Sequence, residues 1–372
     1  MIVIKRLEEN PFGLLLKIFL FGLLCNVQCL RSTYSTLTTG KYLSLTNVQI
    51  EADMSIFRGF TYTKLIRGFY DHGLYNISGK DFSQILFDPT CYRKQIQDGD
   101  IVVVRGETLD LFIHEVFNKI DKSIILVCHS DKTFPDEYPN QATLHNFLEN
   151  DRLIWVFAQN FNPDSGLSRV SFFPLGLPHG RGLTRFRDIG LMFPKTPSQQ
   201  DNSFDLILKK LAPTDKRKPT ALCDFLNSKT GRGRFKQLGE DRSTIAQKLR
   251  EQNVCDFLPH RVPLHDLLSS KGEYAFDISP PGTGFDCYRT WESLILGCIV
   301  IVKSSFLDPL YEGLPVVIIN SWEEVTKENM QRWLSEYGDV FHNPDIREKL
   351  THKYWMEKIR KVQNEYRLNL ET

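Results

Sequence analysis

Apolar runs alternate with amphipathic stretches and with Gly- or Pro-rich turns along much of this chain. The clearest example is Tyr274–Val302, which reads as an apolar strand, a Pro-Pro-Gly-Thr-Gly loop, a stretch with helical spacing and a second strand. Proline lacks an amide hydrogen and interrupts strands and helix interiors, so residues 280–284 are predicted to form a loop. Ile299–Val302 is apolar at consecutive positions, which is typical of a parallel strand buried on both faces. Strand, loop, helix and strand together form half of a doubly wound sheet.

The same alternation is found on both sides of this stretch. Further strands are predicted at Ile101–Val104, Ser123–Cys128, Leu153–Phe157, Val170–Phe173, Thr220–Leu226 and Pro315–Ile319. Helices are predicted at Leu109–Ile120, Ala142–Leu148, Phe204–Leu211, Ser243–Glu251, His265–Ser270, Phe285–Leu296, Trp322–Tyr337 and Asp345–Leu368. Strands that alternate with helices indicate an α/β protein, with helices on both faces of a parallel sheet.

The chain of 372 residues has room for two domains of ordinary size. We place the first domain at 98–185 and the second at 218–343. A linker at 186–217 is predicted to join them because residues 180–201 are rich in Gly, Pro, Arg and Ser. A C-terminal helix is predicted at 344–372. Residues 32–97 are predicted to form a stem and an N-terminal extension.

Composition and charge narrow the possible functions. The apolar content of 41% and the charged content of 24% are those of a globular protein. A net charge of +1 gives no electrostatic attraction to nucleic acid or to an anionic membrane, and no basic tract is interleaved with aromatic residues. We therefore expect no nucleic-acid partner. The eight cysteines form no Cys-x-x-Cys pair and no Cys/His cluster with zinc spacing, so no metal site is predicted.

Residues 1–31 are predicted to form a targeting segment. Basic residues precede an apolar stretch at 12–27, which Lys17 interrupts. The uninterrupted run at 18–25 is short for a membrane span and suits the core of a cleaved signal peptide. With Lys17 reaching the interface, the longer stretch would instead be a signal anchor. A buried helix of the fold is the remaining alternative.

The loop at residues 280–284 combines features that suit an anion. Glycines let backbone N–H groups approach a ligand, and the following helix start adds roughly half a unit of positive charge. Arg289 and Glu292 are three residues apart and therefore neighbours on the helix surface. The guanidinium can bind a phosphate through two hydrogen bonds, and the carboxylate can accept hydrogen bonds from two sugar hydroxyls. In the alternative interpretation, Arg289 and Glu292 pair with each other on a solvated face.

This stretch resembles the nucleotide-sugar-binding half of exostosin-like glycosyltransferases. That family has a Ser-Pro-Pro-Gly-x-Gly loop, an Asp-x-x-Arg-x-x-Glu helix and a following apolar strand. The resemblance assigns nucleotide-sugar binding to Ser279, Gly282, Thr283, Gly284, Asp286, Arg289 and Glu292. Many relatives have Pro at the position of Val300 and Asn or a similar residue at Thr283, and both departures leave Arg289 and Glu292 in place.

The first half resembles the acceptor-side domain of the same family more loosely. The resemblance depends on His129-Ser130-Asp131 after the second strand, on the Ala-Gln-Asn at 158–160 and on the Pro-Leu-Gly at 174–176. His129 and Asp131 are expected at the carboxyl end of a parallel strand, where functional groups gather in such sheets. An attacking hydroxyl needs a general base, which contributes about 10²- to 10⁴-fold, and these two residues are the candidates.

Two further stretches carry charged residues. Asp98-Gly99-Asp100 precedes a strand, so it is expected at the end of the sheet away from a ligand, and we interpret it as a turn and not as a metal site. The loop at 229–234 follows a predicted strand and could contact a diphosphate. The family has an arginine in this region, which here is Arg234 or Arg242, and Arg234 is our candidate. A solvated basic loop is the alternative.

The resemblance implies two Rossmann-like domains that face a cleft, the GT-B arrangement. It implies an inverting glycosyltransferase that moves a sugar from a nucleotide sugar, expected to be a UDP-sugar, to a hydroxyl of a glycan or glycoprotein. No cofactor is expected, and the need for a divalent metal stays open. The implied location is the lumen of the Golgi or endoplasmic reticulum, as a single-pass type II membrane protein, or the outside of the cell after signal cleavage. Asn76-Ile77-Ser78 is the only N-glycosylation sequon. The alternative function is a non-catalytic scaffold that binds a nucleotide or a glycan.

Overall fold

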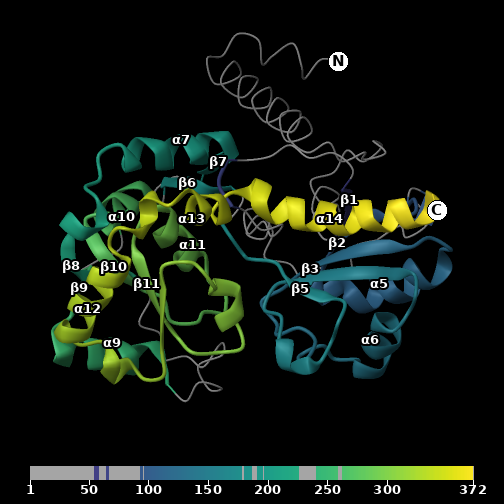
Figure 1. Cartoon of the computed structure of the whole chain (residues 1–372), viewed down its shortest axis with the longest axis horizontal. Helices are drawn as coiled ribbons and strands as arrows, with labels where there is room; N and C mark the ends of the chain where they lie inside the picture. The colour runs from purple at the N-terminus through teal and green to yellow at the C-terminus, as the bar shows by residue number, and fades with distance from the viewer. Residues whose placement is uncertain are drawn as a thin grey trace, which may run out of the picture.

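The computed structural model in Figure 1 shows two halves, each built on its own β-sheet. It describes residues 54–57, 64–66, 93–94, 96–177, 180–186, 191–195, 197–225, 240–258 and 262–371. The predictions made for the segment 1–31, for the sequon at Asn76 and for Arg234 lie outside these ranges.

The first sheet has five strands, which lie side by side in the order of the sequence. They are β1 (Met54–Phe57), β2 (Asp100–Arg105), β3 (Ile124–His129), β4 (Leu153–Ala158) and β5 (Val170–Phe172). Strands β2 to β5 are parallel, and β1 pairs antiparallel with β2. The helices α5 (Leu109–Glu115) and α6 (Gln141–Leu148) bury one apolar cluster against one face. Since β3 and β4 are parallel neighbours, the residues that follow them lie at the same edge of the sheet.

The second sheet is parallel throughout and has the order β12-β11-β10-β8-β9. Its strands are β8 (Lys218–Cys223), β9 (Cys255–Phe257), β10 (Tyr274–Ile278), β11 (Ile299–Lys303) and β12 (Val316–Ile319). The chain leaves β8 toward β9 on one side and then returns to place β10 on the other side. In open α/β sheets, ligands bind beyond the carboxyl ends of the strands at such a reversal of strand order.

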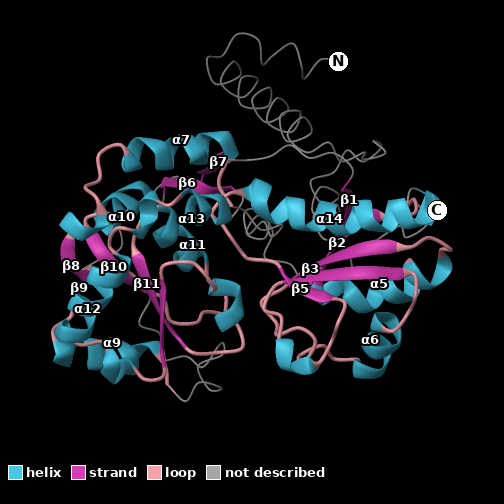
Figure 2. Cartoon of the chain, viewed as in Figure 1, coloured by secondary structure: helices cyan, strands magenta, loops and turns pink. Residues whose placement is uncertain are grey.

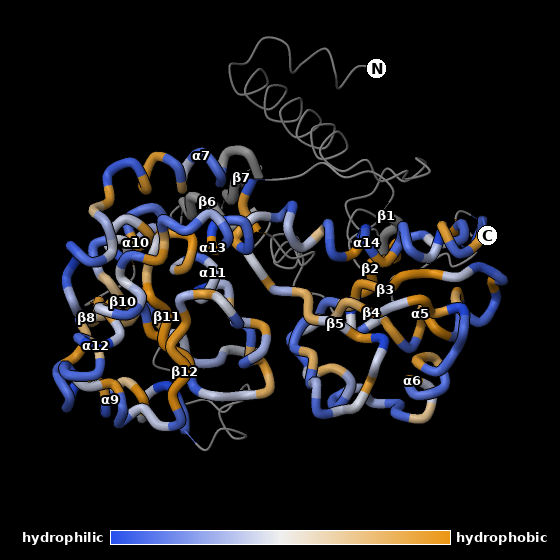
Figure 3. The backbone as a smooth tube through the Cα atoms, viewed as in Figure 1, coloured by the Kyte–Doolittle hydropathy of each residue, from blue (hydrophilic) through white to orange (hydrophobic). Residues whose placement is uncertain are grey.

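Helices cover both faces of the second sheet, as Figure 2 shows. The helices α9 (Arg242–Gln252) and α12 (Lys327–Tyr337) share an apolar cluster with one face. The helices α10 (Leu264–Lys271) and α11 (Tyr288–Ile295) contribute to the cluster on the other face. Among the described residues, the strands of both sheets include strongly hydrophobic stretches (Figure 3). The predicted α/β class with parallel sheets is therefore confirmed, and every predicted strand is present with ends within three residues.

Residues predicted to form a linker contain regular structure. Strand β6 (Gly180–Phe186) pairs antiparallel with β7 (Leu191–Lys195), and α7 (Pro197–Leu208) follows. The hairpin was not predicted because its sequence is rich in Gly, Pro and Arg, which are typical of a loop. Single turns of 3-10 helix complete the described elements at Gly106–Thr108, Phe117–Lys119, Pro163–Ser165, Thr214–Lys216, Asp308–Tyr311, Trp322–Glu324 and Val340–His342.

The C-terminal helix connects the two halves. The single helix expected at residues 345–368 is two helices, α13 (Pro344–Lys349) and α14 (His352–Glu371). The break lies where the amide of Ile66 donates to the carbonyl of Leu350 at 2.9 Å. Helix α14 then runs from the second sheet across the first (Figure 1).

Two contacts fix the path of α14. Trp355 packs edge-to-face on Trp291 of α11, with ring centroids 6.4 Å apart. The side-chain amide of Gln363 donates to the carbonyl of Gly99 at 2.6 Å, at the amino end of β2. One apolar cluster consequently includes residues of both sheets and of α14.

The turn interpretation of the Asp98-Gly99-Asp100 stretch agrees with the contacts of its carboxylates. Asp98 accepts a hydrogen bond from the amide of Ser123 at 2.8 Å, and Asp100 accepts one from the amide of Gln97 at 2.8 Å. Gly99 has a φ of 73°, a conformation that glycine adopts without strain. Both carboxylates lie at the amino end of β2, opposite the edge where the residues that follow β3 and β4 lie.

The predicted cellular location requires a correction. The location expected from the sequence was that of a single-pass type II membrane protein of the Golgi or endoplasmic reticulum, or of a secreted protein. Within the ranges that the structure describes, none of the helices has the length and the apolar character needed to cross a bilayer. The membrane-anchored location and the membrane contact are therefore withdrawn.

Candidate functional site

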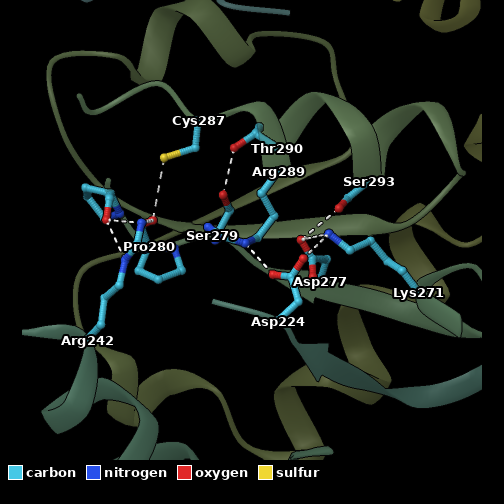
Figure 4. Close-up of polar contacts among 11 residues, drawn as sticks. Asp224, Arg242, Lys271, Asp277, Ser279, Pro280, Cys287, Arg289, Thr290 and Ser293 are labelled. Carbon is cyan, nitrogen blue, oxygen red and sulfur yellow. Dashed lines mark hydrogen bonds and ion pairs between the residues drawn. The ribbon is translucent and has the colours of Figure 1, made fainter. Parts of the chain in front are cut away.

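A buried charge network lies at the reversal of strand order in the second sheet. Asp224 directly follows β8, and Asp277 belongs to the neighbouring strand β10. Arg289 reaches from α11 and forms an ion pair with Asp224. The Nζ atom of Lys271, which is fully buried at the end of α10, lies 3.0 Å from Asp224 Oδ2 and 3.5 Å from Asp277 Oδ2 (Figure 4). Two cations and two carboxylates thus meet at the carboxyl ends of β8 and β10.

The two carboxylates of this network differ in their pKa. Burial acts to raise the pKa of Asp224, but the charges of Lys271 and Arg289 outweigh it and hold the pKa well below its usual range. Burial raises the pKa of Asp277 to about 7 in spite of the nearby charge of Lys271. Burial also acts to lower the pKa of Lys271, but Asp224 and Asp277 outweigh it and raise that pKa. At neutral pH, Asp224 therefore carries the firmly ionised carboxylate that faces Arg289.

The loop at residues 280–284 is tightly constrained. The hydroxyl groups of Ser279 and Thr290 are 2.8 Å apart, which ties the end of β10 to α11. The amide of Gly282 donates to the carbonyl of Gly284 at 2.8 Å. The residue before α11 is Cys287, whose backbone is extended and whose side chain makes no capping hydrogen bond to the helix. A helix start without a side-chain cap can present its first amides to an anion.

Arg242, the first residue of α9, holds this loop from outside (Figure 4). Its Nε and Nη2 atoms donate to the carbonyl of Pro281 at 3.0 and 2.7 Å. Burial and the nearby charge of Arg289 lower the pKa of Arg242 to about 10. The guanidinium groups of Arg242 and Arg289 therefore repel each other beside the loop, and a bound anion would relieve that repulsion. Arg242 is the second of the two arginines weighed in the sequence analysis, and Arg234, the preferred one, lies outside the described residues.

Glu292 lies on the same helix as Arg289, but its side chain is buried and not on a solvated face. Glu292 is only 5% exposed, the Arg289 side chain is 14% exposed, and Arg289 pairs with Asp224. The charge of Glu292 contributes to the raised pKa of Lys271. The structure therefore disagrees with the alternative in which Arg289 and Glu292 pair on a solvated face.

Asp286, predicted to bind the nucleotide sugar, joins the two halves of the molecule. Its carboxylate accepts hydrogen bonds from the amide of Leu175 at 2.7 Å and from the indole N–H of Trp291 at 2.8 Å. Its own amide donates to Asn160 Oδ1 at 2.8 Å. Burial raises the pKa of Asp286 to about 7, against the effect of these hydrogen bonds. These contacts make Asp286 a connection between the Gly-rich loop and the first half.

The structure separates the two candidate bases. His129 is the last residue of β3 and is 1% exposed. Asp131 is partly exposed and lies against the loop, because a Cβ atom placed on Gly284 would be 3.1 Å from the carbonyl oxygen of Asp131. The charge of Asp131 also contributes to the raised pKa of Asp286. Asp131 is thus brought next to the Gly-rich loop, whereas His129 is covered. Thr283 is exposed at the tip of that loop.

Three residues of the site were not predicted from the sequence: Asp224, Lys271 and Asn160. Asp224 lies inside the strand predicted at Thr220–Leu226, and only the structure, in which β8 ends at Cys223, places it at a strand end. Asn160 belongs to a stretch that had been noted only for its resemblance. Lys271 gave no signal, because a lysine at the end of a short polar helix is usually exposed.

Comparisons with known proteins give weak similarities. No family model matches the sequence, and no curated protein matches it. Among solved structures, TarM has a TM-score of 0.40 and 10% identity, with 74% of this chain and 57% of that chain covered. The GtfA/B complex has a TM-score of 0.41 and 12% identity, and the match covers 84% of this chain and 65% of that one. The pneumococcal O-GlcNAc transferase GtfA, solved with UDP and GlcNAc, has a TM-score of 0.33 and 9% identity. That match covers 86% of this chain and 64% of the other.

The chain spans 57 to 65% of the length of these three structures. None of them is an exostosin-like protein by its description, so membership of that family stays a prediction from the sequence.

Proposed function

We propose that this protein is a glycosyltransferase that takes its sugar from a nucleotide sugar, with a UDP-sugar as donor and a hydroxyl of a glycan or glycoprotein as acceptor. The observation that supports this most strongly is the position of Arg242 and Arg289. These two guanidinium groups flank the Gly-rich loop at the reversal of strand order in the second sheet. Cations, glycine amides and a helix start at this place suit a diphosphate.

The leaving diphosphate gains negative charge as the bond to the sugar breaks, and donors placed there in advance stabilise it. In this proposal Arg289 binds the diphosphate while Asp224 keeps its other contact, the ion pair with Lys271. Arg242, the amide of Gly284 and the uncapped start of α11 complete the diphosphate site. Glu292 accepts hydrogen bonds from the ribose hydroxyls. Ser279 and Thr283 shape the loop, and Asp286 fixes it to the first half.

The acceptor enters from the first half in this proposal. Asp131 removes the proton from the acceptor hydroxyl. The hydroxyl oxygen forms a bond to the sugar while the bond between the sugar and the diphosphate breaks, in a single inverting displacement. We prefer Asp131 to His129 as the general base because Asp131 is partly exposed beside the loop and His129 is covered. His129 then supports the loop that carries Asp131.

An assay of UDP release from UDP-sugars tests this proposal on the full chain, with water or an added glycan as acceptor. Glu292→Ala should weaken UDP binding whether the protein is an enzyme or a scaffold. Asp131→Ala should lower the rate by about 10²- to 10⁴-fold with unchanged UDP affinity. Wild-type protein that binds UDP but never releases it from any UDP-sugar would instead support the non-catalytic scaffold. A full rate in both Asp131→Ala and His129→Ala would show that neither residue is the base.

A further inference from the structure

Asn160 lies where the two halves of the molecule meet. It follows β4 at the carboxyl edge of the first sheet and is 4% exposed. Its backbone is left-handed, with a φ of 49°. Such a conformation costs free energy for any residue with a side chain, although Asn tolerates it better than most. Neighbouring contacts must hold it in place, and a strained buried residue of this kind often marks a functional position.

The side-chain amide of Asn160 bonds to both halves. Its Nδ2 atom donates to the carbonyl of Ser130 at 2.8 Å, in the loop that carries Asp131. Its Oδ1 atom accepts from the amide of Asp286 at 2.8 Å, two residues after the Gly-rich loop. One rigid side chain therefore sets the separation between the loop at residues 129–131 and the loop at residues 280–286.

The two loops also touch directly at this point. A Cβ atom on Gly284 would lie 2.9 Å from Asn160 Nδ2 and 3.2 Å from the Cα atom of Asp131. Only a glycine allows this approach without displacing one of these neighbours. The hydrogen bonds of Asn160 and the close packing of Gly284 thus both fix the distance between the loop at residues 129–131 and the loop at residues 280–286.

We infer that Asn160 is a positioning residue that holds the acceptor-side loop against the donor-side loop, so that Asp131 faces the sugar. This inference rests on the proposed function for its effect on the rate. Arg242 and Arg289 are held by other contacts, to Pro281 and Asp224, so the positions of these two donor-binding side chains do not depend on Asn160. Misplacing a reacting group by about 1 Å can lower a rate by about 10²-fold.

Asn160→Gly is a clean test because glycine accepts the same φ while losing both hydrogen bonds. Asn253→Gly is the matched control, since Asn253 also has a positive φ, of 52°, but is exposed at the C-terminal end of α9. Asn160→Asp is a second variant, which keeps the oxygen for the amide of Asp286 but cannot donate to Ser130. The contact of Asp286 with Leu175 remains in both variants and keeps the halves joined.

Two measurements on the full chain separate this inference from the proposed function. Amide hydrogen exchange of peptides that cover 129–134 and 279–287 should accelerate together in Asn160→Gly, and should not change in Asn253→Gly. UDP affinity should stay within about threefold of wild type, while the rate of UDP release from a UDP-sugar falls by at least tenfold.

Each outcome decides one of the two claims. Unchanged exchange, or acceleration in only one of the two peptides, would overturn the assignment of Asn160 as the link between the loops. Accelerated exchange in both peptides with a wild-type rate would overturn its effect on catalysis. A wild-type protein that shows no UDP binding and no UDP release would overturn the proposed function, and the exchange data would still test the link.

Discussion

Arg289 on α11 pairs with Asp224, a residue that lies 65 positions earlier in the sequence and follows β8. This pair connects the helix that follows the Gly-rich loop to the neighbouring strand at the reversal of strand order. It also keeps the guanidinium in place before a ligand arrives. A diphosphate would share Arg289 with Asp224, and Lys271 would continue to neutralise Asp224 from its other side.

Asp224→Ala should be among the most destabilising single substitutions in this region, because it leaves Arg289 and Lys271 buried without their main carboxylate. Breaking a buried pair on one side costs about 3–5 kcal/mol of unfolding free energy. The double variant Asp224→Ala with Arg289→Ala should lose less than the sum of the two single variants. Urea unfolding measures all three.

Asp215→Ala is the matched control, because Asp215 forms an ion pair with Lys216 on the exposed surface. Its unfolding free energy should change little. Strict additivity of the Asp224 and Arg289 substitutions would contradict the coupling between the two side chains.

Arg242→Ala should weaken UDP binding by about 10- to 100-fold, the range expected for a lost charge-assisted hydrogen bond. Arg242→Lys should recover only part of the affinity, because an ammonium group cannot reproduce the two bonds that the guanidinium makes to Pro281. Isothermal titration calorimetry measures both. Arg250→Ala, on the exposed face of the same helix, is the control. Equal affinities for the Arg242 and Arg250 variants would exclude Arg242 from the site.

The stability contributed by Asp286 should fall as the pH rises. The pKa of Asp286 is about 7 in the folded chain and near its ordinary 3.8 in the unfolded chain. Between pH 4 and 7 the folded state therefore holds a proton that the unfolded state has lost, so unfolding free energy decreases through this window, by at most about 4 kcal/mol. Asp286→Asn removes this dependence, although Asn cannot accept the hydrogen bonds of both Leu175 and Trp291.

Urea unfolding of both proteins at pH 4.5 and 7.5 gives the comparison. The unfolding free energy of Asp286→Asn, relative to that of wild type, should be higher at pH 7.5 than at pH 4.5. A difference between the two proteins that stays constant across this range would contradict the raised pKa.

Gly284→Ala should lower both stability and turnover. The added methyl group would lie 2.9 Å from Asn160 Nδ2, and Asn160 is buried and cannot move freely. Overpacking of this kind costs about 1–3 kcal/mol of unfolding free energy. Thermal unfolding and the UDP-release assay check both effects. A variant with wild-type stability and wild-type turnover would show that the two loops are not held at a fixed distance.

The sequence predicted the parts of this molecule that depend on local pattern. Consecutive apolar residues such as Ile299–Val302 favour a strand that is buried on both faces. In the structure they form the buried strand β11. The loop at residues 280–284 followed in the same way from its prolines and glycines. Pattern alone did not reveal where helices break. The helix predicted at 109–120 ends at Glu115, and the break after α13 depends on the distant Ile66.

The partners of the site residues could not be predicted, because they depend on strand order. Nothing in the sequence near Arg289 indicates that Asp224 will lie beside it, since this requires β8 and β10 to be neighbours. The contact of Asp286 with Leu175 depends on how the two halves meet. Lys271 is at the end of a short polar helix, and its complete burial follows only from the two carboxylates around it.

Nucleotide binding by the full chain is the most direct test of the central claim, that the loop between Arg242 and Arg289 holds the diphosphate of a nucleotide sugar. The measurement is the melting temperature with UDP, GDP, CMP and NAD, each with and without Mn²⁺, for wild type and Arg289→Ala. A ligand at 100 times its dissociation constant stabilises the folded state by about 2.7 kcal/mol, which corresponds to a shift of several degrees. We expect UDP to raise the melting temperature of wild type with or without Mn²⁺, and to have no effect on Arg289→Ala. The absence of a shift with every nucleotide, or a UDP shift that persists in Arg289→Ala, would contradict the assignment of this loop as the nucleotide site.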